Sequence, residues 1–169
     1  MLDTLRHGND LSEILMVGHN PNARQKLSDA ATQALRQHIQ APHSLLAYVC
    51  GREVKSGAGV IALSEGKVLV YQSATQKVTA VALAQITQVQ AVRGKYGHTV
   101  RVIAQGHTHA LFGVDKALAE QLHQALLGAG VQSSFEDKAP LGTLWAAYPS
   151  PQPSANDCLA DARQRLMAA

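Results

Sequence analysis

Residues 59–71 have the sequence GVIALSEGKVLVY, in which two short apolar runs flank the dipeptide Glu65-Gly66. Runs of this length that are rich in Val, Ile and Leu are typical of buried strands. A two-residue connection that ends in Gly is typical of a tight hairpin, because Gly readily adopts the positive φ that such turns require. The stretch therefore predicts two antiparallel strands, over residues 58–64 and 67–73.

The same pattern of short apolar runs and turn residues continues on both sides of this hairpin. We predict seven strands, over residues 45–52, 58–64, 67–73, 78–83, 86–92, 98–104 and 107–112. Their connections are too short for parallel crossovers, which need about a dozen residues each. Residues 93–97 (RGKYG) are predicted to form a longer hairpin loop. The segment is therefore expected to form an antiparallel sheet that closes on itself.

The last of these hairpins has two possible registers. With a two-residue turn at Gln105-Gly106, the histidines of the last strand share a face with Val102. With a three-residue loop over 104–106, they lie on the opposite face. We favour the second register because it gathers a consistent apolar set. It groups Val100, Val102, Thr108, Ala110 and Phe112 on the buried face, and Arg101, Ile103, His107, His109 and Leu111 on the other.

Helical spacing appears on both sides of the strands. At residues 114–127, Asp115 is expected to cap or begin a helix and Gly128 to end it. Before the strands, Asn20-Pro21 predicts the start of a long helix that ends before Pro42. A shorter helix is predicted over residues 10–17. The apolar stripe of the long helix consists of Ala23, Leu27, Ala31, Leu35 and Ile39.

Beyond Gly130 the sequence loses clear periodicity. Residues 149–153 (PSPQP) predict a stiff, extended linker. Asn156-Asp157 is then expected to cap a final short helix. The apolar side of this helix carries Leu159, Ala162, Leu166 and Met167. These patterns divide the chain into an N-terminal helical arm (1–43), a strand-rich domain (44–129) and a C-terminal tail (130–169).

Several stretches of the strand-rich domain resemble the bacterial pleckstrin-homology-like (PH-like) domains, in particular the YokE-like group. They are residues 59–71, 83–89 (LAQITQV), 93–97 and 112–116 (FGVDK). The resemblance covers about residues 44–128 and rests on packing and turn motifs. It implies an α+β fold, in which a seven-stranded antiparallel bent sheet or partly open barrel is capped by a C-terminal helix. Several bacterial members form ring-like oligomers and most have no assigned chemistry, so the resemblance implies a fold and leaves the function open.

Eukaryotic relatives of this family bind inositol phosphates through basic residues of the first hairpin. In this chain Arg52 and Lys55 lie at that hairpin, but the strand over 58–64 carries no basic residue. We therefore interpret Arg52 and Lys55 as solvated charges and do not expect phosphoinositide binding.

The composition excludes several classes of protein. With 46% hydrophobic and 16% charged residues, the chain does not have the composition of a disordered protein. No apolar run approaches the roughly 18–20 residues of a membrane helix, and the first residues lack the pattern of a signal peptide. We therefore expect a cytoplasmic protein without membrane contact. The net charge of +3 is too small to indicate a nucleic-acid partner.

The positive charge is concentrated in the predicted strands, where residues 45–112 carry seven basic side chains and two acidic ones. Arg93 and Lys95 flank a glycine, and Arg101 follows in the next strand. These three residues are the candidate anion-binding residues, because cations beside glycine N–H groups can hold a phosphate. The alternative is structural, since charges at a hairpin tip also keep strand edges from pairing wrongly.

His107 and His109 are weak candidates for a metal site, because residues two apart in a strand share one face. A zinc site needs four ligands, or three ligands and a water. The favoured register also places Arg101 on that face, where its charge opposes a dication. We therefore predict no metal and interpret the pair as exposed strand residues. His38 and His123 are interpreted as boundary residues of their helices.

Nucleophilic catalysis finds no support in the sequence. Cys50 lies within an apolar run, where burial raises the pKa of a thiol and makes it inert. Cys158 lies far from it in sequence, and the two have neither metal nor disulfide spacing. The glycine-rich motifs of hydrolases, nucleotide-binding loops and dinucleotide-binding folds are missing. We therefore predict a protein that is not an enzyme and binds no cofactor.

These observations predict a non-enzymatic binding or assembly module that forms homo-oligomers. A protein partner is expected to bind through the N-terminal helix or through the C-terminal tail, where residues 141–148 contain the sole Trp, Trp145. Whether these two flanks pack on their own domain or on another subunit is left open. The alternative function is binding of a small anion or lipid headgroup through the basic hairpin residues. An enzyme of uncharacterised activity is the least favoured possibility.

Overall fold

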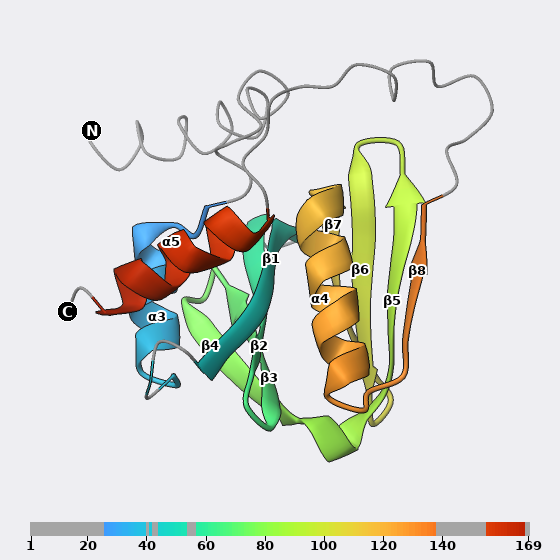
Figure 1. Ribbon diagram of the computed structural model, residues 1–169, viewed down its shortest axis with the longest axis horizontal. Coiled ribbons are helices and arrows are strands. Elements are labelled where there is room, and N and C mark those ends of the chain that lie inside the picture. Colours follow the sequence, from blue (N-terminus) through green and yellow to red (C-terminus); the bar gives the residue numbers. More distant parts are fainter. Residues whose placement is uncertain (1–25, 40, 42–43, 54–56, 138–154, 168–169) are drawn as a thin grey trace.

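The computed structural model describes residues 26–39, 41, 44–53, 57–137 and 155–167 (Figure 1). In this part of the chain the fold is α+β, with one open, mostly antiparallel sheet of eight strands. The strands are β1 (Leu45–Glu53), β2 (Gly57–Ser64), β3 (Lys67–Gln72), β4 (Lys77–Ala82), β5 (Ile86–Gly94), β6 (Gly97–Ala104), β7 (His107–Val114) and β8 (Ser133–Glu136). The helices are α3 (Asp29–Arg36), the short 3₁₀ helix η2 (Leu83–Gln85), α4 (Lys116–Gly128) and α5 (Ala155–Met167).

The predicted hairpin over 58–64 and 67–73 is confirmed as β2 and β3. Ser64 pairs with Lys67, so the turn contains Glu65 and Gly66 alone, and Gly66 has a φ of 77°. Buried apolar side chains fill both strands, with Ile61 and Leu69 almost fully enclosed. This hairpin therefore forms from local sequence signals, as the turn and strand propensities predict.

The sheet is open, so the closure expected from the short connections is not made. Its strand order is β4-β3-β2-β1-β7-β6-β5-β8, which places β4 and β8 at the two edges. β1 and β7 pair only at Arg52 and Phe112, and η2 carries the chain from β4 to β5. The sequence prediction missed β8, a strand of four residues that runs parallel to β5.

The predicted register of the β6–β7 hairpin is wrong. Ala104 pairs with His107, and Gln105 and Gly106 form a two-residue turn with φ values of 48° and 80°. Positive φ at both positions gives the turn whose twist matches that of the strands. Val102 consequently pairs with His109, so these two residues lie on the same face of the sheet. All β7 residues from His107 to Phe112 therefore lie on the face opposite to the predicted one, so that Leu111 is buried and Phe112 is 36% exposed.

The loop predicted over residues 93–97 is also shorter than expected. Gly94 pairs with Gly97, which leaves Lys95 and Tyr96 as a two-residue turn between β5 and β6. Arg93 therefore belongs to β5, directly opposite His98 in β6. This pairing fixes the position of the Arg93 side chain at the end of the sheet.

Helix α4 matches the predicted helix closely at its start. The Asp115 carboxylate accepts a hydrogen bond from the Ala117 N–H at 2.9 Å, which makes Asp115 the N-cap. The predicted end is wrong by one residue, because Gly128 is still helical, Ala129 is the C-cap and Gly130 takes a positive φ of 82°. The buried side of α4 is formed by Leu118, Ala119, Leu122 and Leu126.

The two flanking helices α3 and α5 lie side by side against the β1–β4 part of the sheet (Figure 1). Residues 26–28 are not helical, and the Ser28 hydroxyl caps α3, so the predicted long helix is not continuous. Its expected start at Asn20-Pro21 lies outside the described residues, as does the helix predicted over 10–17. Leu27, Ala31, Leu35 and Ile39 of the predicted stripe are buried in the core, as are Leu159, Ala162 and Leu166 of α5. Met167 was predicted on the buried side of α5 but is 69% exposed.

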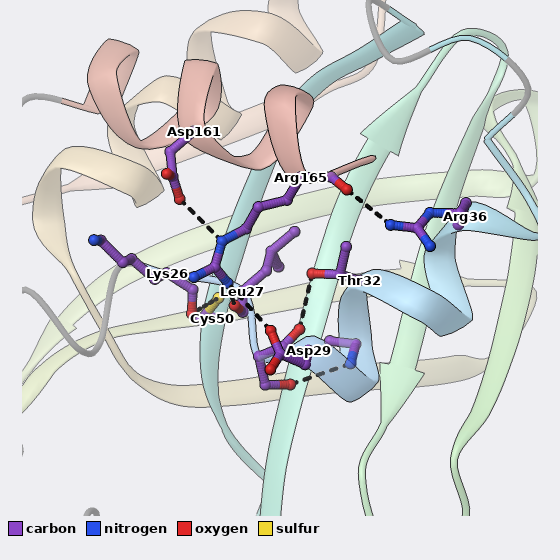
Figure 2. A network of polar contacts seen from close by, with 10 residues as sticks. Lys26, Leu27, Asp29, Thr32, Arg36, Cys50, Asp161 and Arg165 are labelled. Atoms are coloured by element: carbon purple, nitrogen blue, oxygen red, sulfur yellow. Dashed lines mark hydrogen bonds and ion pairs between the residues drawn. The ribbon is translucent and has the colours of Figure 1, made fainter. Parts of the chain in front are cut away.

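Arginine side chains join α3 and α5 (Figure 2). Arg165 of α5 donates a hydrogen bond to the Leu27 carbonyl and pairs with Asp161 at 3.4 Å. In the opposite direction, Arg36 of α3 donates a hydrogen bond to the Arg165 carbonyl of α5 at 2.8 Å. These bonds satisfy the Arg165 carbonyl in the last turn of α5 and the Leu27 carbonyl just before the N-cap of α3. The buried apolar residues of α3 and α5 therefore pack within the same chain, and these polar contacts link the two helices.

Candidate functional site

A recess of about 170 Å³ opens where three elements meet at one end of the sheet. These elements are the β5–β6 turn, the start of α4 and the residue that follows β8. The recess is lined by Arg93, Gly94, Lys95, Gly97, His98, Val114, Asp115, Lys116 and Asp137. Three of these side chains, those of Arg93, Lys95 and Lys116, carry basic groups, whereas the lining of the smaller recess described below has no Lys or Arg.

The Asp137 carboxylate is the focus of the polar contacts in the recess. Lys116 Nζ lies 2.6 Å from its Oδ2 atom, whereas Arg93 Nη1 lies 3.4 Å from its Oδ1 atom. His98 Nε2 approaches the same Oδ1 atom at 3.5 Å. One oxygen therefore has a short, charge-assisted contact, and the other has only long ones.

The charges around Asp137 favour its ionised form. Partial burial raises the pKa of this carboxyl, but the hydrogen bond and charge of Lys116, with the charge of Arg93, outweigh that effect. The pKa of Asp137 is therefore below its ordinary value. The carboxylate is an acceptor in the recess throughout the neutral range.

His98 is the most enclosed polar side chain in the recess, with 2% of its side chain exposed. Its ring stacks on Phe135 of β8, with ring centroids 5.0 Å apart and an interplanar angle of 9°. Among the described residues Nε2 has no hydrogen-bond partner, so the hydrogen bond to the Glu136 backbone belongs to Nδ1. Burial is the main cause that lowers the pKa of His98. The Asp137 charge opposes this effect, whereas the Arg93 and Lys116 charges add to it, and the net pKa lies below the ordinary value.

We expect His98 to reduce the stability of the protein in mild acid. The neutral ring is favoured in the folded protein, so below the ordinary His pKa of about 6.5 the unfolded chain binds a proton that the folded chain does not. The free energy of unfolding, measured with urea at fixed protein concentration, should therefore fall between about pH 7 and pH 5. For this one group the slope is at most about 1.4 kcal/mol per pH unit.

The matched variant is His98→Phe, which keeps a ring against Phe135 and cannot titrate. Its free energy of unfolding should show a smaller slope over the same pH range. Because slopes are compared, a general loss of stability from the larger ring does not affect the outcome. Equal slopes in the two proteins would contradict the expectation.

The structure brings two of the three predicted anion-binding residues together. Arg93 and Lys95 both line the recess, but Arg101 pairs with Gln90 and Ala110 in the middle of the sheet and does not line it. The prediction missed Lys116, His98 and Asp137. Lys116 follows the helix cap Asp115, so its place at the start of α4 was readable from the sequence, whereas nothing in the pattern around Asp137 indicates its contact with Arg93.

His107 and His109 lie on one face of β7, as their spacing predicts. His107 is exposed, whereas His109 is half-buried and lines a second, smaller recess of about 90 Å³ with Glu53 and Gln72. Arg101 lies on the opposite face, so the predicted charge conflict with a metal ion at this pair is wrong. In the described part of the chain, no three His, Cys, Asp or Glu side chains gather closely enough to hold a metal ion.

The other predicted residues take varied positions. Arg52 is exposed at the end of β1, and Lys55 lies outside the described residues, as does Trp145. His123 on α4 shares a 2.8 Å hydrogen bond with the Ser133 hydroxyl and stacks on Phe135. Burial raises the pKa of the Cys50 thiol to about 12, which agrees with the predicted inert thiol.

The chain matches no protein-family model and no curated protein. None of the helices in the described ranges is long and apolar enough to span a membrane.

Proposed function

We propose that this protein is a non-enzymatic, PH-like assembly module whose copies associate through the edge strand β4. The observation that carries the proposal is that β4 pairs on one side only, with β3, among the described residues. An edge strand offers a row of backbone donors and acceptors to another chain. The PH-like assignment is supported by the antiparallel strands β1–β7 and by the helix α4 that follows them.

The side chains of β4 do little to oppose pairing with another strand. Thr79, Ala80 and Ala82 are exposed, and Lys77 is the sole charged residue of the strand. Proteins commonly protect edge strands with several charges, with proline or with a bulge. β4 has one charge at its first position, and its register with β3 is regular from Lys77 to Ala82.

The register identifies which backbone groups of β4 face outward. The Leu83 N–H donates to the Gly66 carbonyl, so the hydrogen-bonded pairs with β3 alternate from this point. Lys77, Thr79 and Val81 consequently bond to β3. The N–H and C=O groups of Val78, Ala80 and Ala82 point away from the sheet.

Two copies of β4 can pair about a twofold axis through Ala80. In that arrangement the Ala80 N–H of each copy donates to the Ala80 carbonyl of the other, and Val78 pairs with Ala82. The two Lys77 side chains lie at opposite ends of the pair, so their charges do not meet. The arrangement extends the sheet across the dimer.

Burial of the flanking helices favours this edge over the flanks as the contact surface. Leu35 of α3 and Leu166 of α5 are buried against the sheet of their own chain. Association through those apolar stripes would require the helices to leave that sheet. Pairing through β4 leaves the described core intact.

The test is sedimentation equilibrium of the full chain and of Ala80→Pro. Proline at position 80 removes an outward N–H and leaves the β3 hydrogen bonds in place, which is a position that edge strands tolerate. Two intersubunit hydrogen bonds are lost per dimer, worth about 1 kcal/mol each. We expect the dissociation constant to rise about 30-fold.

The matched control is Ala80→Thr, which keeps the N–H and should associate as the unmodified chain does. A chain that is monomeric at micromolar concentration would contradict the proposal. So would an assembly that Ala80→Pro leaves unchanged while the variant remains folded by circular dichroism.

A further inference from the structure

We propose that the recess between the β5–β6 turn, the start of α4 and Asp137 binds a protonated phosphate, with Arg93 and Lys116 as donors and His98 and Asp137 as acceptors. The ligand class is inorganic phosphate or a small phosphate monoester that carries one P–O–H group. This site is separate from the β4 edge and does not depend on assembly through it.

The donors of the recess outnumber the acceptors that Asp137 supplies. The Arg93 guanidinium carries five N–H donors and the Lys116 ammonium carries three. The single short contact among them is the one between Lys116 and Oδ2, at 2.6 Å. Arg93 remains 3.4 Å from Oδ1, so much of its donor capacity is available to a ligand oxygen in the recess.

Lys95 adds a further cation at the mouth of the recess. It belongs to the two-residue turn, and its ammonium lies 5.5 Å from the centre of the Tyr96 ring. Three cations at one recess, with Asp137 and the helix cap Asp115 as the acidic residues of its lining, favour an anionic ligand. A phosphate presents several oxygens to them, whereas one carboxylate presents two.

His98 indicates that the anion also carries a proton. Because Nδ1 holds the hydrogen bonded to the Glu136 backbone, Nε2 of the neutral ring presents a lone pair. This lone pair lies 3.5 Å from Asp137 Oδ1, which is a second acceptor. Two neighbouring acceptors without a hydrogen between them favour a ligand that donates one, since His98 is buried and an unsatisfied buried polar atom is costly.

Hydrogen phosphate meets both requirements in one ligand. Its unprotonated oxygens accept from Arg93, Lys95 and Lys116, and its P–O–H group donates to His98 Nε2 or to Asp137. Sulfate has the same shape but carries no proton at neutral pH. It satisfies the cations, leaves His98 Nε2 unpaired and faces the Asp137 charge directly. The site should therefore distinguish two anions of equal size.

The test compares phosphate with sulfate at neutral pH and constant ionic strength. The full chain is titrated with each anion, and binding is followed by calorimetry and by the amide NMR shifts of Arg93, His98 and Lys116. We expect phosphate to bind at least about tenfold more tightly than sulfate. Arg93→Gln should weaken phosphate binding by about tenfold.

Three further variants make the test specific. Arg101→Gln removes an equal charge from the neighbouring strand and should change phosphate binding by less than about twofold, because Arg101 does not line the recess. Asp137→Asn should bring the affinities for phosphate and sulfate close together. Lys95→Gln lies at an exposed turn, so it should weaken phosphate binding without lowering the free energy of unfolding.

A parallel measurement with vesicles that contain phosphatidic acid identifies the source of the phosphate. Binding of inorganic phosphate without vesicle binding assigns the site to soluble phosphates, and vesicle binding that Arg93→Gln abolishes assigns it to a lipid phosphate. Absence of both would overturn the proposal. Equal affinities for phosphate and sulfate, or an Arg101→Gln effect as large as that of Arg93→Gln, would overturn it as well.

Discussion

Replacing Gly51 by alanine is expected to lower the free energy of unfolding by about 3 kcal/mol, because the position has no room for a side chain. A Cβ atom there would lie 2.7 Å from the Phe112 carbonyl oxygen and 2.9 Å from Leu111 Cβ. Both are parts of β7 close to its backbone, so a rotation of a flexible side chain cannot relieve the contact. The two halves of the sheet would have to separate where β1 meets β7.

Two paired glycines, Gly51 and Gly59, make room for the packing at the junction of β1 and β7. Gly51 pairs with Gly59 of β2, and a Cβ atom at position 59 would lie 2.8 Å from Leu111 Cδ2. Leu111 therefore packs over two adjacent glycines and is almost fully buried there. The junction depends on this packing, because β1 and β7 share only the pair Arg52 and Phe112.

The measurement is urea unfolding of Gly51→Ala beside Gly128→Ala. Position 128 lies at the end of α4, where an added Cβ atom meets nothing within 4 Å. Alanine there should raise the free energy of unfolding by about 0.5–1 kcal/mol, because it restricts the unfolded chain and favours the helix. If Gly51→Ala were as stable as Gly128→Ala, the close contact between β1 and β7 would be refuted.

Replacing Leu35 of α3 by alanine is expected to lower the free energy of unfolding by about 2–5 kcal/mol. Leu35 has 0% of its surface exposed and belongs to the core cluster with residues of the sheet. Removing its side chain loses apolar contacts and leaves a cavity between α3 and β3. The effect would establish that this N-terminal segment stabilises the domain.

Gln33→Ala is the matched control for this prediction, because Gln33 lies on the exposed side of the same helix. Its effect should stay within about 0.5 kcal/mol. Both variants are compared by urea unfolding at equal protein concentration. A Leu35→Ala variant as stable as Gln33→Ala would mean that the apolar stripe of α3 does not pack on the sheet in solution.

The predictions that the structure confirms depend on short-range signals. Glu65-Gly66 between two apolar runs is enough to specify the β2–β3 hairpin, and Asp115 is enough to specify the start of α4. A turn or a cap involves residues only a few positions apart, so the sequence pattern contains nearly all of its energetics.

The sequence-based predictions are wrong where contacts between segments distant in the chain determine the structure. Both registers of the β6–β7 hairpin are allowed locally, and the packing of Leu111 over Gly51 and Gly59 favours the observed one. The sequence of β8 shows no strand pattern. This segment is a strand because it pairs with the backbone of β5, which supplies its hydrogen-bond partners. Met167 continues the apolar spacing of α5, but its side chain is exposed with respect to the described residues.

The candidate site shows the same division. The sequence indicates Arg93 and Lys95 through their charge and the glycine between them, and the pairing of Arg93 with His98 follows from the two-residue turn at Lys95 and Tyr96. Asp137 is 44 residues from Arg93 in the chain, and it reaches the recess only because β8 pairs beside β5. The acceptor side of the proposed phosphate site could therefore not be predicted from any local pattern.

The sequence by itself determined the individual strands, the β2–β3 turn, the cap of α4 and the basic character of the β5–β6 turn, because each depends on residues that are neighbours in the chain. The tertiary structure decided the register of β7, the addition of β8, the burial of both flanking helices and the meeting of Arg93, His98, Lys116 and Asp137. The physical reason is that packing and electrostatic contacts depend on distance in space. Only the folded sheet brings the two carboxylate oxygens of Asp137 among those three side chains.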